Sequence, residues 1–443
     1  MADISYNNME RGILMKTQKR TIDASPTKEL FIYMLTRDID VKPAVVELID
    51  NSIDGAKKIR PNKDYSNLYI KLILSKEKFM IEDNCSGIDI ETAQKYAFKF
   101  GRVTQTNDKA SGYYTGIFGI GMKRALFKLG NKFQIISRTK TDYFELKVDV
   151  RHWIQEEEWN FQFDRCETDL QNKETGTKII VEDLNSDILS KFQSELFINS
   201  LIDYIQKYRT VEAENGLKIE VNMIEVNYRK EKLLESEYIH PYYKKVKDKQ
   251  GTITIVAGIA EKGDPGKAGW YIYCNGRLVL YADKTNLTGW GDGNRAYHNS
   301  MAEFRGYVYF ESKNLLALPW NTTKTGIDAS NRLYIIARQS MNEAMAQIFH
   351  TIGNIKKLYD VNDMQEIDFV KKATEKELTY KSIALISDAD FTMKTPEKVI
   401  PKTRISFTEP TAEVDKVKES LGEKTNKAVG EKLFNYYCEM EGI

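Results

Sequence analysis

The chain has 443 residues, of which 42% are hydrophobic and 29% are charged, and this length is enough for two or three domains with their own cores. Its 65 basic and 64 acidic residues leave a net charge of +1, which excludes a global field that attracts nucleic acid, so any contact with DNA needs a local patch. No apolar run approaches the ~20 residues of a membrane span, and the polar N-terminus lacks the apolar stretch of a secretory signal. We therefore expect a cytoplasmic protein without membrane contact.

The cysteines and histidines are few and widely separated. Neither the four cysteines nor the four histidines have the spacing of metal ligands, and the cysteines do not form a disulfide framework. A structural zinc site is therefore not expected.

A first domain is expected over residues 28–193, after a polar N-terminal arm of residues 1–27. The apolar pattern predicts helices at 27–38, around 44–56 and at 122–130, and strands at 67–74, 79–84, 132–139, 143–150 and 176–184. A glycine-rich region at 101–121 leads into the third of these helices. This alternation predicts an α+β sandwich in which helices cover one face of a mostly antiparallel sheet.

A second domain is expected over residues 194–360. A helix at 194–209 leads into it, strands are predicted at 218–226, 252–260, 270–280 and 304–310, and a long helix at 331–358. Residues 361–443 are expected to form a proline-bearing linker and a C-terminal helical tail, with one final helix at 413–440. The tail either packs on the second domain or pairs between subunits.

Three polar side chains lie within the otherwise apolar helix around residues 44–56. Glu47, Asn51 and Asp54 are four and three residues apart, so they project from one helix face. An ordinary amphipathic helix with a solvated polar face explains this pattern equally well. Two stretches further along the chain favour a ligand site instead.

The first of these stretches, IEDNCSGID, ends a predicted strand with an acid at residue 83. A buried carboxylate at a strand end can accept a hydrogen bond from an exocyclic amine such as that of adenine, which suits Asp83. Gly87 lets the backbone approach a base closely. A simple strand-ending turn is the alternative.

The second stretch, TGIFGIGMKRALFKLG, places three glycines before a helix. Gly116, Gly119 and Gly121 precede a helix whose N-terminus offers unpaired N–H groups to an anion, and Lys123 adds positive charge in its first turn. The spacing is not that of a Walker loop. Taken alone, such a loop is weak evidence.

In order and in spacing, these stretches resemble the GHKL superfamily of ATPases, which includes gyrase-type topoisomerases, MutL, Hsp-type chaperones, sensor kinases and MORC proteins. The resemblance covers a fourth motif at Gly176–Thr177 and implies a Bergerat-type ATP-binding sandwich. The residues that it assigns to ATP binding are Asn51, Asp54, Asp83, Gly87, Ile88, Gly116, Gly119, Ile120, Gly121, Met122, Lys123 and Thr177. One departure is Cys85–Ser86, which precede Gly87 where the family usually has glycine at once; this puts the flexibility of the loop in doubt, but not the acceptor Asp83.

The resemblance also implies roles and cofactors. Glu47 is the expected general base that polarises the attacking water, and Asn51 the expected ligand of Mg²⁺ bound with ATP. Asp54 is expected to support the water and metal shell, and Thr177 to bond near the adenine.

The second domain resembles a ribosomal S5-like transducer, the domain that follows the ATPase in gyrase, MutL and MORC proteins. Lys324 matches the loop lysine that reaches the γ-phosphate in those families. Asn275, Arg277 and Leu278, followed by the stretches 304–306 and 319–324, look most like MORC proteins. This implies slow hydrolysis, a homodimer that forms on ATP binding, and DNA or an effector protein as candidate partners in genome maintenance or phage defence. A MutL-like repair factor and an Hsp-type chaperone remain the alternatives.

Overall fold

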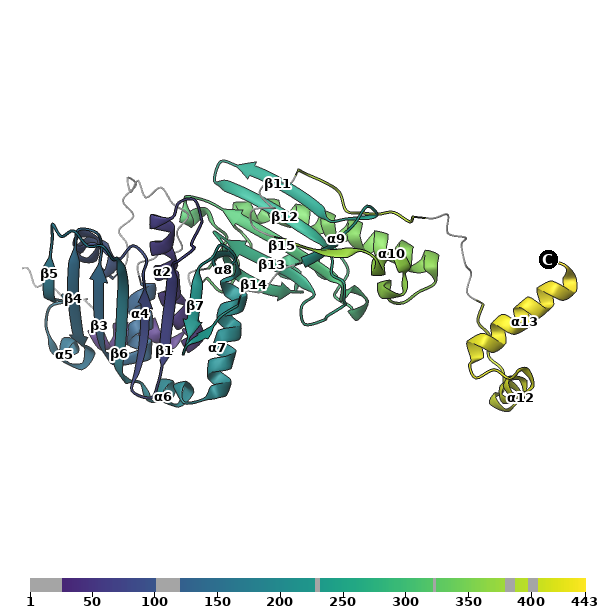
Figure 1. The fold of residues 1–443 in the computed structure, drawn as a ribbon, viewed down its shortest axis with the longest axis horizontal. Helices are drawn as coiled ribbons and strands as arrows, with labels where there is room; N and C mark the ends of the chain where they lie inside the picture. Colours follow the sequence, from purple (N-terminus) through teal and green to yellow (C-terminus); the bar gives the residue numbers. More distant parts are fainter. Residues whose placement is uncertain (1–25, 101–119, 228–231, 322–323, 379–386, 397–404) are drawn as a thin grey trace, which may run out of the picture.

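The computed structural model describes residues 26–100, 120–227, 232–321, 324–378, 387–396 and 405–443. They form a first domain on an eight-stranded sheet, a second domain on a five-stranded sheet, and two terminal helices that lie apart from both (Figure 1). Among the helices within these ranges, none is long and apolar enough to cross a membrane.

The first sheet is antiparallel except where one pair of strands runs parallel. Its strands are β1 (Tyr69–Leu74), β2 (Lys78–Asp83), β3 (Gly130–Arg138), β4 (Tyr143–Asp149), β5 (Phe163–Glu167), β6 (Gly176–Leu184), β7 (Lys218–Val221) and β8 (Ile224–Glu225). Their order is β5-β4-β3-β6-β2-β1-β7-β8, and only β1 and β7 are paired in parallel among these described strands. The α+β architecture expected for this domain is confirmed.

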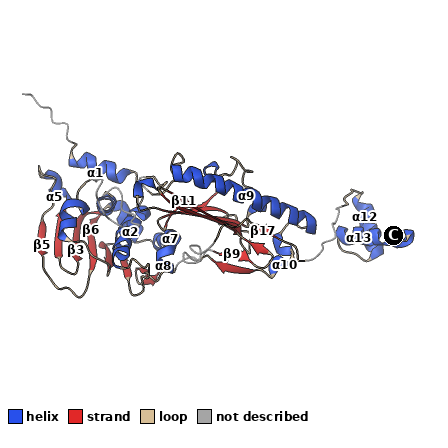
Figure 2. Cartoon of the chain, turned by 90° about the horizontal axis from the view of Figure 1, so that it is seen from above, coloured by secondary structure: helices blue, strands red, loops and turns tan. Residues whose placement is uncertain are grey.

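Helices lie on one face of this sheet (Figure 2). They include α1 (Lys28–Arg37), α2 (Val41–Ile59) and α4 (Gly121–Leu129), and the shorter or peripheral helices are α3 (Ile90–Thr92), η1 (Ala93–Ala97), α5 (Val150–Gln155), α6 (Ser186–Phe192), α7 (Glu195–Tyr208) and α8 (Thr210–Glu214). In α2, Val45, Ile49 and Ile53 recur at a spacing of four and are fully buried in the core of the first domain. The opposite face of α2 is thereby left for polar residues.

Residues 194–226 complete the first domain, so the expectation that they begin the second is wrong. β7 pairs in parallel with β1, and Ile205, Ile219 and Val221 are buried in the core of the first domain. The alternating pattern at 218–226 predicts one strand, whereas the structure has β7 and β8 joined by a turn at Asn222 and Met223, with φ values of +48° and +66°. The pattern carries no information about which sheet supplies the hydrogen-bonding partner, because that choice depends on long-range contacts.

The second domain is a five-stranded sheet with a long helix along one face (Figure 2). Its strands β11 (Tyr242–Asp248), β12 (Gly251–Ile259), β13 (Gly269–Cys274), β14 (Arg277–Asp283) and β15 (Phe304–Glu311) are ordered β11-β12-β15-β13-β14, and the helix is α9 (Arg332–Tyr359). The short elements are β9 (Lys232–Glu235), β10 (Ile239–His240), η2 (Asn286–Thr288), η3 (Asn299–Met301), η4 (Leu315–Ala317), η5 (Met364–Glu366), α10 (Asp368–Lys371), β16 (Thr374–Glu377) and β17 (Thr392–Met393). Trp270, Phe304 and Met341 are fully buried where α9 meets the sheet.

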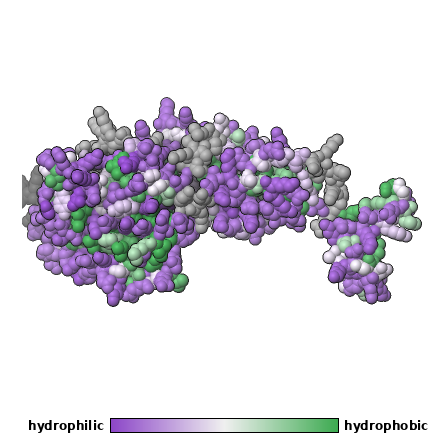
Figure 3. Space-filling view, in the orientation of Figure 1, coloured by the Kyte–Doolittle hydropathy of each residue, from purple (hydrophilic) through white to green (hydrophobic). Residues whose placement is uncertain are grey.

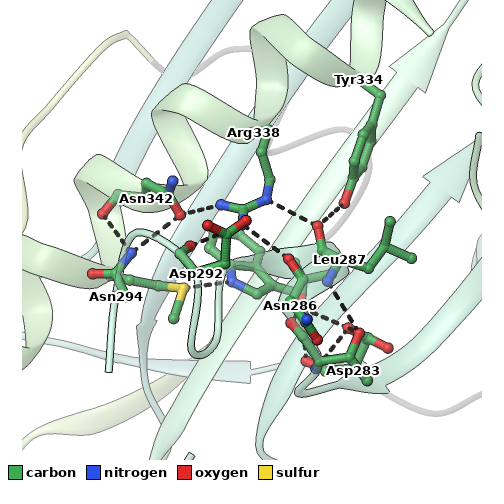
Figure 4. Close-up of polar contacts among 12 residues, drawn as sticks. Asp283, Asn286, Leu287, Asp292, Asn294, Tyr334, Arg338 and Asn342 are labelled. Carbon is green, nitrogen blue, oxygen red and sulfur yellow. Dashed lines mark hydrogen bonds and ion pairs between the residues drawn. The ribbon is translucent and has the colours of Figure 1, made fainter. Parts of the chain in front are cut away.

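The loop after β14 is anchored to α9 by one guanidinium (Figure 4). Arg338 donates hydrogen bonds to the carbonyls of Asn286 and Leu287, both at 2.9 Å, and to the carbonyl of Asp292 at 3.0 Å. The Tyr334 hydroxyl donates to the same Leu287 carbonyl at 2.6 Å. The end of β14 is therefore held firmly on the long helix.

Residues 361–378 and 391–393 belong to the second domain, although a linker was expected from residue 361. Met364, Ile367, Phe369 and Val370 are buried in its core, and β16 and β17 pair with β9 and β10. Elements of two to four residues are too short to produce a periodic pattern, which is why the sequence does not indicate them.

The tail contains two helices instead of the single one predicted. α12 (Thr411–Leu421) ends at Gly422, whose φ of +69° favours glycine, and α13 (Asn426–Glu441) begins after Thr425, whose side chain accepts from the Ala428 N–H. The surface of this segment carries both hydrophilic and hydrophobic residues (Figure 3). The break follows from the ordinary stop and start residues of helices.

Candidate functional site

Helix α2 carries the three predicted polar residues, of which Glu47 contacts the second domain. Pro43 lies in its first turn, where a backbone N–H would have no partner within the helix. Glu47 is buried with 5% of its surface exposed, Asn51 one turn later is exposed, and Asp54 is half-buried. The three residues therefore lie in different environments.

The Glu47 carboxylate contacts two cations from the second domain. Its Oε2 lies 3.1 Å from the Lys324 ammonium, and its Oε1 lies 3.3 Å from Nη1 of Arg277. Burial acts to raise the pKa of Glu47, but the charges of Lys324 and Arg277 outweigh it and leave this pKa below its usual value. The carboxylate is thus ionised, and both of its oxygens are engaged.

Lys324 reaches this carboxylate from a loop that follows η4. Its side chain is 4% exposed and also lies 3.7 Å from Oδ2 of Asp50. Burial lowers the pKa of Lys324 to about 8, although the Glu47 carboxylate partly opposes the shift. The Lys324 ammonium is held mainly by the Glu47 carboxylate. It can therefore exchange this carboxylate for another anion.

The start of α4 meets Glu47 at the same point. A Cβ on Gly121 would lie 2.1 Å from Glu47 Oε2, so any other residue there requires this carboxylate or the start of α4 to move. Ile120 is half-buried, and the side chain of Met122 packs in the core, so these two neighbours can offer a ligand only backbone groups. Glu47 Oε2, the Lys324 ammonium and the helix N-terminus converge there, and this combination can hold an anionic group beside a base.

Lys123 does not extend into this point, in contrast to the expectation. Its ammonium donates hydrogen bonds to the carbonyls of Ala97 at 2.7 Å and Lys99 at 2.9 Å. Lys123 is 1% exposed. The carbonyls of Ala97 and Lys99 pair with its buried ammonium. In this structure Lys123 stabilises the end of η1.

Asp83 forms a second polar centre at the end of β2. Its Oδ2 accepts from the Ser52 hydroxyl at 2.6 Å, and its Oδ1 accepts from the backbone N–H groups of Cys85 at 2.9 Å and Thr177 at 3.2 Å. Burial raises the pKa of Asp83, and these hydrogen bonds oppose that shift. Because Ser52 lies five residues after Glu47, the two polar centres are separated by about 7.5 Å along the axis of α2.

The turn after Asp83 is tightly packed, and two glycines make it feasible. Gly87 has a φ of +68°, and a Cβ there would lie 2.1 Å from the Arg138 carbonyl oxygen; a Cβ on Gly176 would lie 2.0 Å from that of Asp83. Ile88 donates its N–H to the Ser137 hydroxyl at 2.7 Å. The backbone around Asp83 is therefore well ordered.

The departure at Cys85–Ser86 does not loosen this turn. Cys85 is buried, its carbonyl accepts from the Thr175 hydroxyl at 2.6 Å, and a Cβ on Gly55 of α2 would lie 3.1 Å from its Cβ. Thr177 places its hydroxyl 3.4 Å from that of Ser137, next to the Asp83 centre.

Several buried polar residues of the site were not predicted from the sequence. Asp50 is 1% exposed and contacts both Arg209 and Arg277, and Ser52 orients Asp83. The sequence did offer a signal for both residues, because Asp50 and Ser52 interrupt an apolar helix. Aspartate and serine are rarely buried, so their presence there indicates polar partners inside the protein. Arg277 was noted only as part of a motif.

The predicted Gly116 and Gly119, most of the glycine-rich region at 101–121 and nearly all of the N-terminal arm lie outside the described residues. No cluster of three or more metal-ligating side chains occurs in the part of the chain that the structure describes. Mg²⁺ that binds together with a nucleotide is usually held by few protein groups, with phosphate oxygens and waters as its other ligands. Asn51, one turn from Glu47, can supply one amide oxygen.

Residues 39–177 match the family model described as histidine kinase-, DNA gyrase B-, and HSP90-like ATPase. The match spans α2 with Glu47, Asp83 at the end of β2 and the start of α4, ends at Thr177, and does not include Arg277 or Lys324. It supports a GHKL-type ATPase domain. Among curated proteins, none matches the chain.

Proposed function

We propose that this protein is a Mg²⁺-dependent ATPase of the GHKL type in which Glu47 is the general base. The observation that carries the proposal is the convergence of Glu47 Oε2, the Lys324 ammonium and the start of α4 at Gly121. A base, a cation and a helix N-terminus at one point are what hydrolysis of a terminal phosphate needs.

The two polar centres, around Glu47 and around Asp83, have separate tasks in this proposal. Asp83 binds the exocyclic amine of adenine, with Thr177 nearby, while Glu47 orients and deprotonates the water that attacks the γ-phosphate. Lys324 exchanges the Glu47 carboxylate for the γ-phosphate and thereby frees Oε2. Asn51, supported by Asp54, holds Mg²⁺, which when bound neutralises charge on the phosphates. Backbone groups at Ile120, Gly121 and Met122 bind phosphate oxygens, and Gly87 with Ile88 lines the base.

The second domain acts as a transducer-like reporter of nucleotide state, because Lys324 belongs to it. We extend the proposal to a homodimer that closes on ATP binding and acts on DNA or an effector protein, as in MORC proteins. The lysine-bearing strand β11 supports DNA as the partner. One of its lysines, Lys244, lies 3.5 Å from Asp388, which neutralises part of the positive charge of the strand. The Hsp-type chaperone and the MutL-like repair factor are the competing functions.

Hydrolysis is tested with Glu47→Gln, which keeps the size of the side chain. We expect release of phosphate from ATP to fall at least ~100-fold, while binding of a non-hydrolysable ATP analogue persists, because a positioned base contributes roughly 10²–10⁴-fold. Equal phosphate release by both proteins would refute the role of Glu47. Asp83→Asn tests the proposed adenine-binding centre, and in this variant binding of the analogue should be lost.

The partner is tested by stimulation of the ATPase. Stimulation by long DNA that weakens with salt supports the DNA-acting dimer, since such binding releases counterions. Stimulation by unfolded protein supports the chaperone. Light scattering with and without the analogue measures dimerisation, and a monomer with saturating analogue contradicts the gated dimer.

A further inference from the structure

A cluster of buried charges joins α2 to the second domain. Asp50 of α2 contacts Arg209, which caps α7, and Arg277, the first residue of β14. The side chains of Arg209 and Arg277 are 1% and 0% exposed. Charges without access to water are stable only when they are paired, so these groups constrain one another's positions.

One nitrogen atom of Arg277 bridges two carboxylates. Nη1 donates to Oε1 of Glu47 at 3.3 Å and to Oδ2 of Asp50. Lys324, by contrast, contacts the other oxygen of Glu47, Oε2, at 3.1 Å. The two oxygens of Glu47 therefore have different partners.

A tight turn places Arg277 at this position. Asn275 and Gly276 connect β13 to β14 with φ values of +47° and +86°, which is the two-residue hairpin geometry that favours Asn-Gly. Lys57 of α2 donates to the Asn275 carbonyl at 3.2 Å and lies 3.3 Å from Glu212. The hairpin tip thus touches α2 at both Lys57 and Asp50.

We propose that Arg277 is a positioning residue that aligns the catalytic base: the second domain, through the β13–β14 tip, fixes Oε1 of Glu47 and leaves Oε2 as the oxygen that accepts the proton from water. The inference rests on the proposed function and adds to it a second contact between the domains. Lys324 leaves Oε2 when the γ-phosphate binds. Arg277 stays, because its Nη1 is also paired with Oδ2 of Asp50.

This arrangement makes the base active only when the two domains are correctly docked. If the hairpin tip moves away from α2, Oε1 loses its partner and the carboxylate can rotate about its side-chain bonds. Asp83, to which the proposed function assigns adenine binding, is held by Ser52, Cys85 and Thr177, and none of these contacts involves the tip. Loss of Arg277 should therefore affect turnover and spare nucleotide binding.

The test compares Arg277→Gln and Arg277→Lys with Lys57→Gln, a matched control that removes a contact to the same hairpin tip without touching Glu47. Each full-length variant is measured for kcat and KM of ATP hydrolysis, for binding of a non-hydrolysable ATP analogue and for thermal unfolding. We expect Arg277→Gln to lower kcat about 100-fold, the loss typical of a misplacement near 1 Å, with analogue affinity within roughly threefold of the parent. Arg277→Lys should recover about tenfold of this loss, because its ammonium can still bridge two carboxylates, and Lys57→Gln should stay within about twofold of the parental kcat.

Parental kcat in Arg277→Gln overturns the inference, as does a loss of analogue binding equal to the loss of kcat, since that is the result of general unfolding of the site. If Arg277→Gln does not unfold cooperatively, Arg277→Lys decides: an unchanged kcat refutes positioning, and a reduced kcat with unchanged analogue binding supports it. Failure of the proposed function is seen separately, as equal hydrolysis by the parent and Glu47→Gln.

Discussion

Replacement of Gly121 by alanine tests the close approach of α4 to Glu47. The added Cβ would lie 2.1 Å from Glu47 Oε2, whereas ordinary contact begins at 3.4 Å, so the carboxylate or the start of α4 must move by about 1.3 Å, the difference between these distances. Movement of the carboxylate by this amount breaks its 3.1 Å contact with Lys324. A misplacement of this size costs about 100-fold in rate.

We expect Gly121→Ala to fold, with a free energy of unfolding lowered by about 1–3 kcal/mol through overpacking. Its kcat for ATP hydrolysis should fall about 100-fold. The matched control is Gly353→Ala within α9, where a Cβ meets no atom within 4 Å. Alanine there should stabilise the helix by about 0.5–1 kcal/mol and leave kcat unchanged.

Release of phosphate at saturating Mg²⁺ and ATP, with urea unfolding of the same samples, measures both quantities. Parental turnover in Gly121→Ala would refute the convergence of Glu47 with the start of α4. Equal losses of stability and of turnover in Gly353→Ala would show that the assay responds to glycine replacement in general.

Three further predictions follow from burial. Because desolvation lowers the pKa of Lys324 to about 8, the protein should lose this cation as pH rises through about 8, so kcat/KM should fall there, and Lys324→Arg should move this basic limb to higher pH. A chain that ends after Asp360 lacks eight of the buried apolar residues that the structure describes, among them Met364, Ile367 and Phe369, and should lose more than about 5 kcal/mol of unfolding free energy, whereas one that ends after Lys394 should melt at the parental temperature in calorimetry. Iodoacetamide should modify exposed Cys166 and not Cys85, whose thiol pKa is raised by burial; peptide mass spectrometry after labelling of the folded protein measures this.

Most elements of the first domain were predictable because their patterns are local. The predicted strand at 176–184 has the same bounds as β6, and the helix at 122–130 differs from α4 by one residue at each end. The sheet to which a strand belongs was not predictable in this way. β7 lies beside β1 because the chain returns to the first sheet after α7 and α8. That decision depends on contacts between residues about 150 positions apart, which no local pattern records.

The candidate site divides in the same way. Glu47 and Asp83 stand out in the sequence because a polar residue interrupts an apolar run or ends a strand. Lys123 shows the limit of this reasoning. Its place in the first turn of a helix predicted an ammonium available to an anionic ligand, but the ammonium donates instead to the carbonyls of Ala97 and Lys99, at and just after the end of η1. Position along a helix determines where a side chain starts, but the partners within its reach determine what it does.

The cluster around Asp50 shows why the interface between the domains is the least predictable part. Arg209, Glu212 and Arg277 each resemble a surface charge in the sequence, and they come from segments about 160–230 residues away from α2. Together with Asp50 they are buried, and breaking one buried pair typically costs 3–5 kcal/mol because it leaves the other charge unpaired. Docking of the second domain therefore has few alternative geometries. Helix α2 carries both Glu47, the proposed base, and Asp50, and Arg277 of the second domain contacts both residues. The position of the second domain is therefore linked to the placement of Glu47 directly, through one rigid helix.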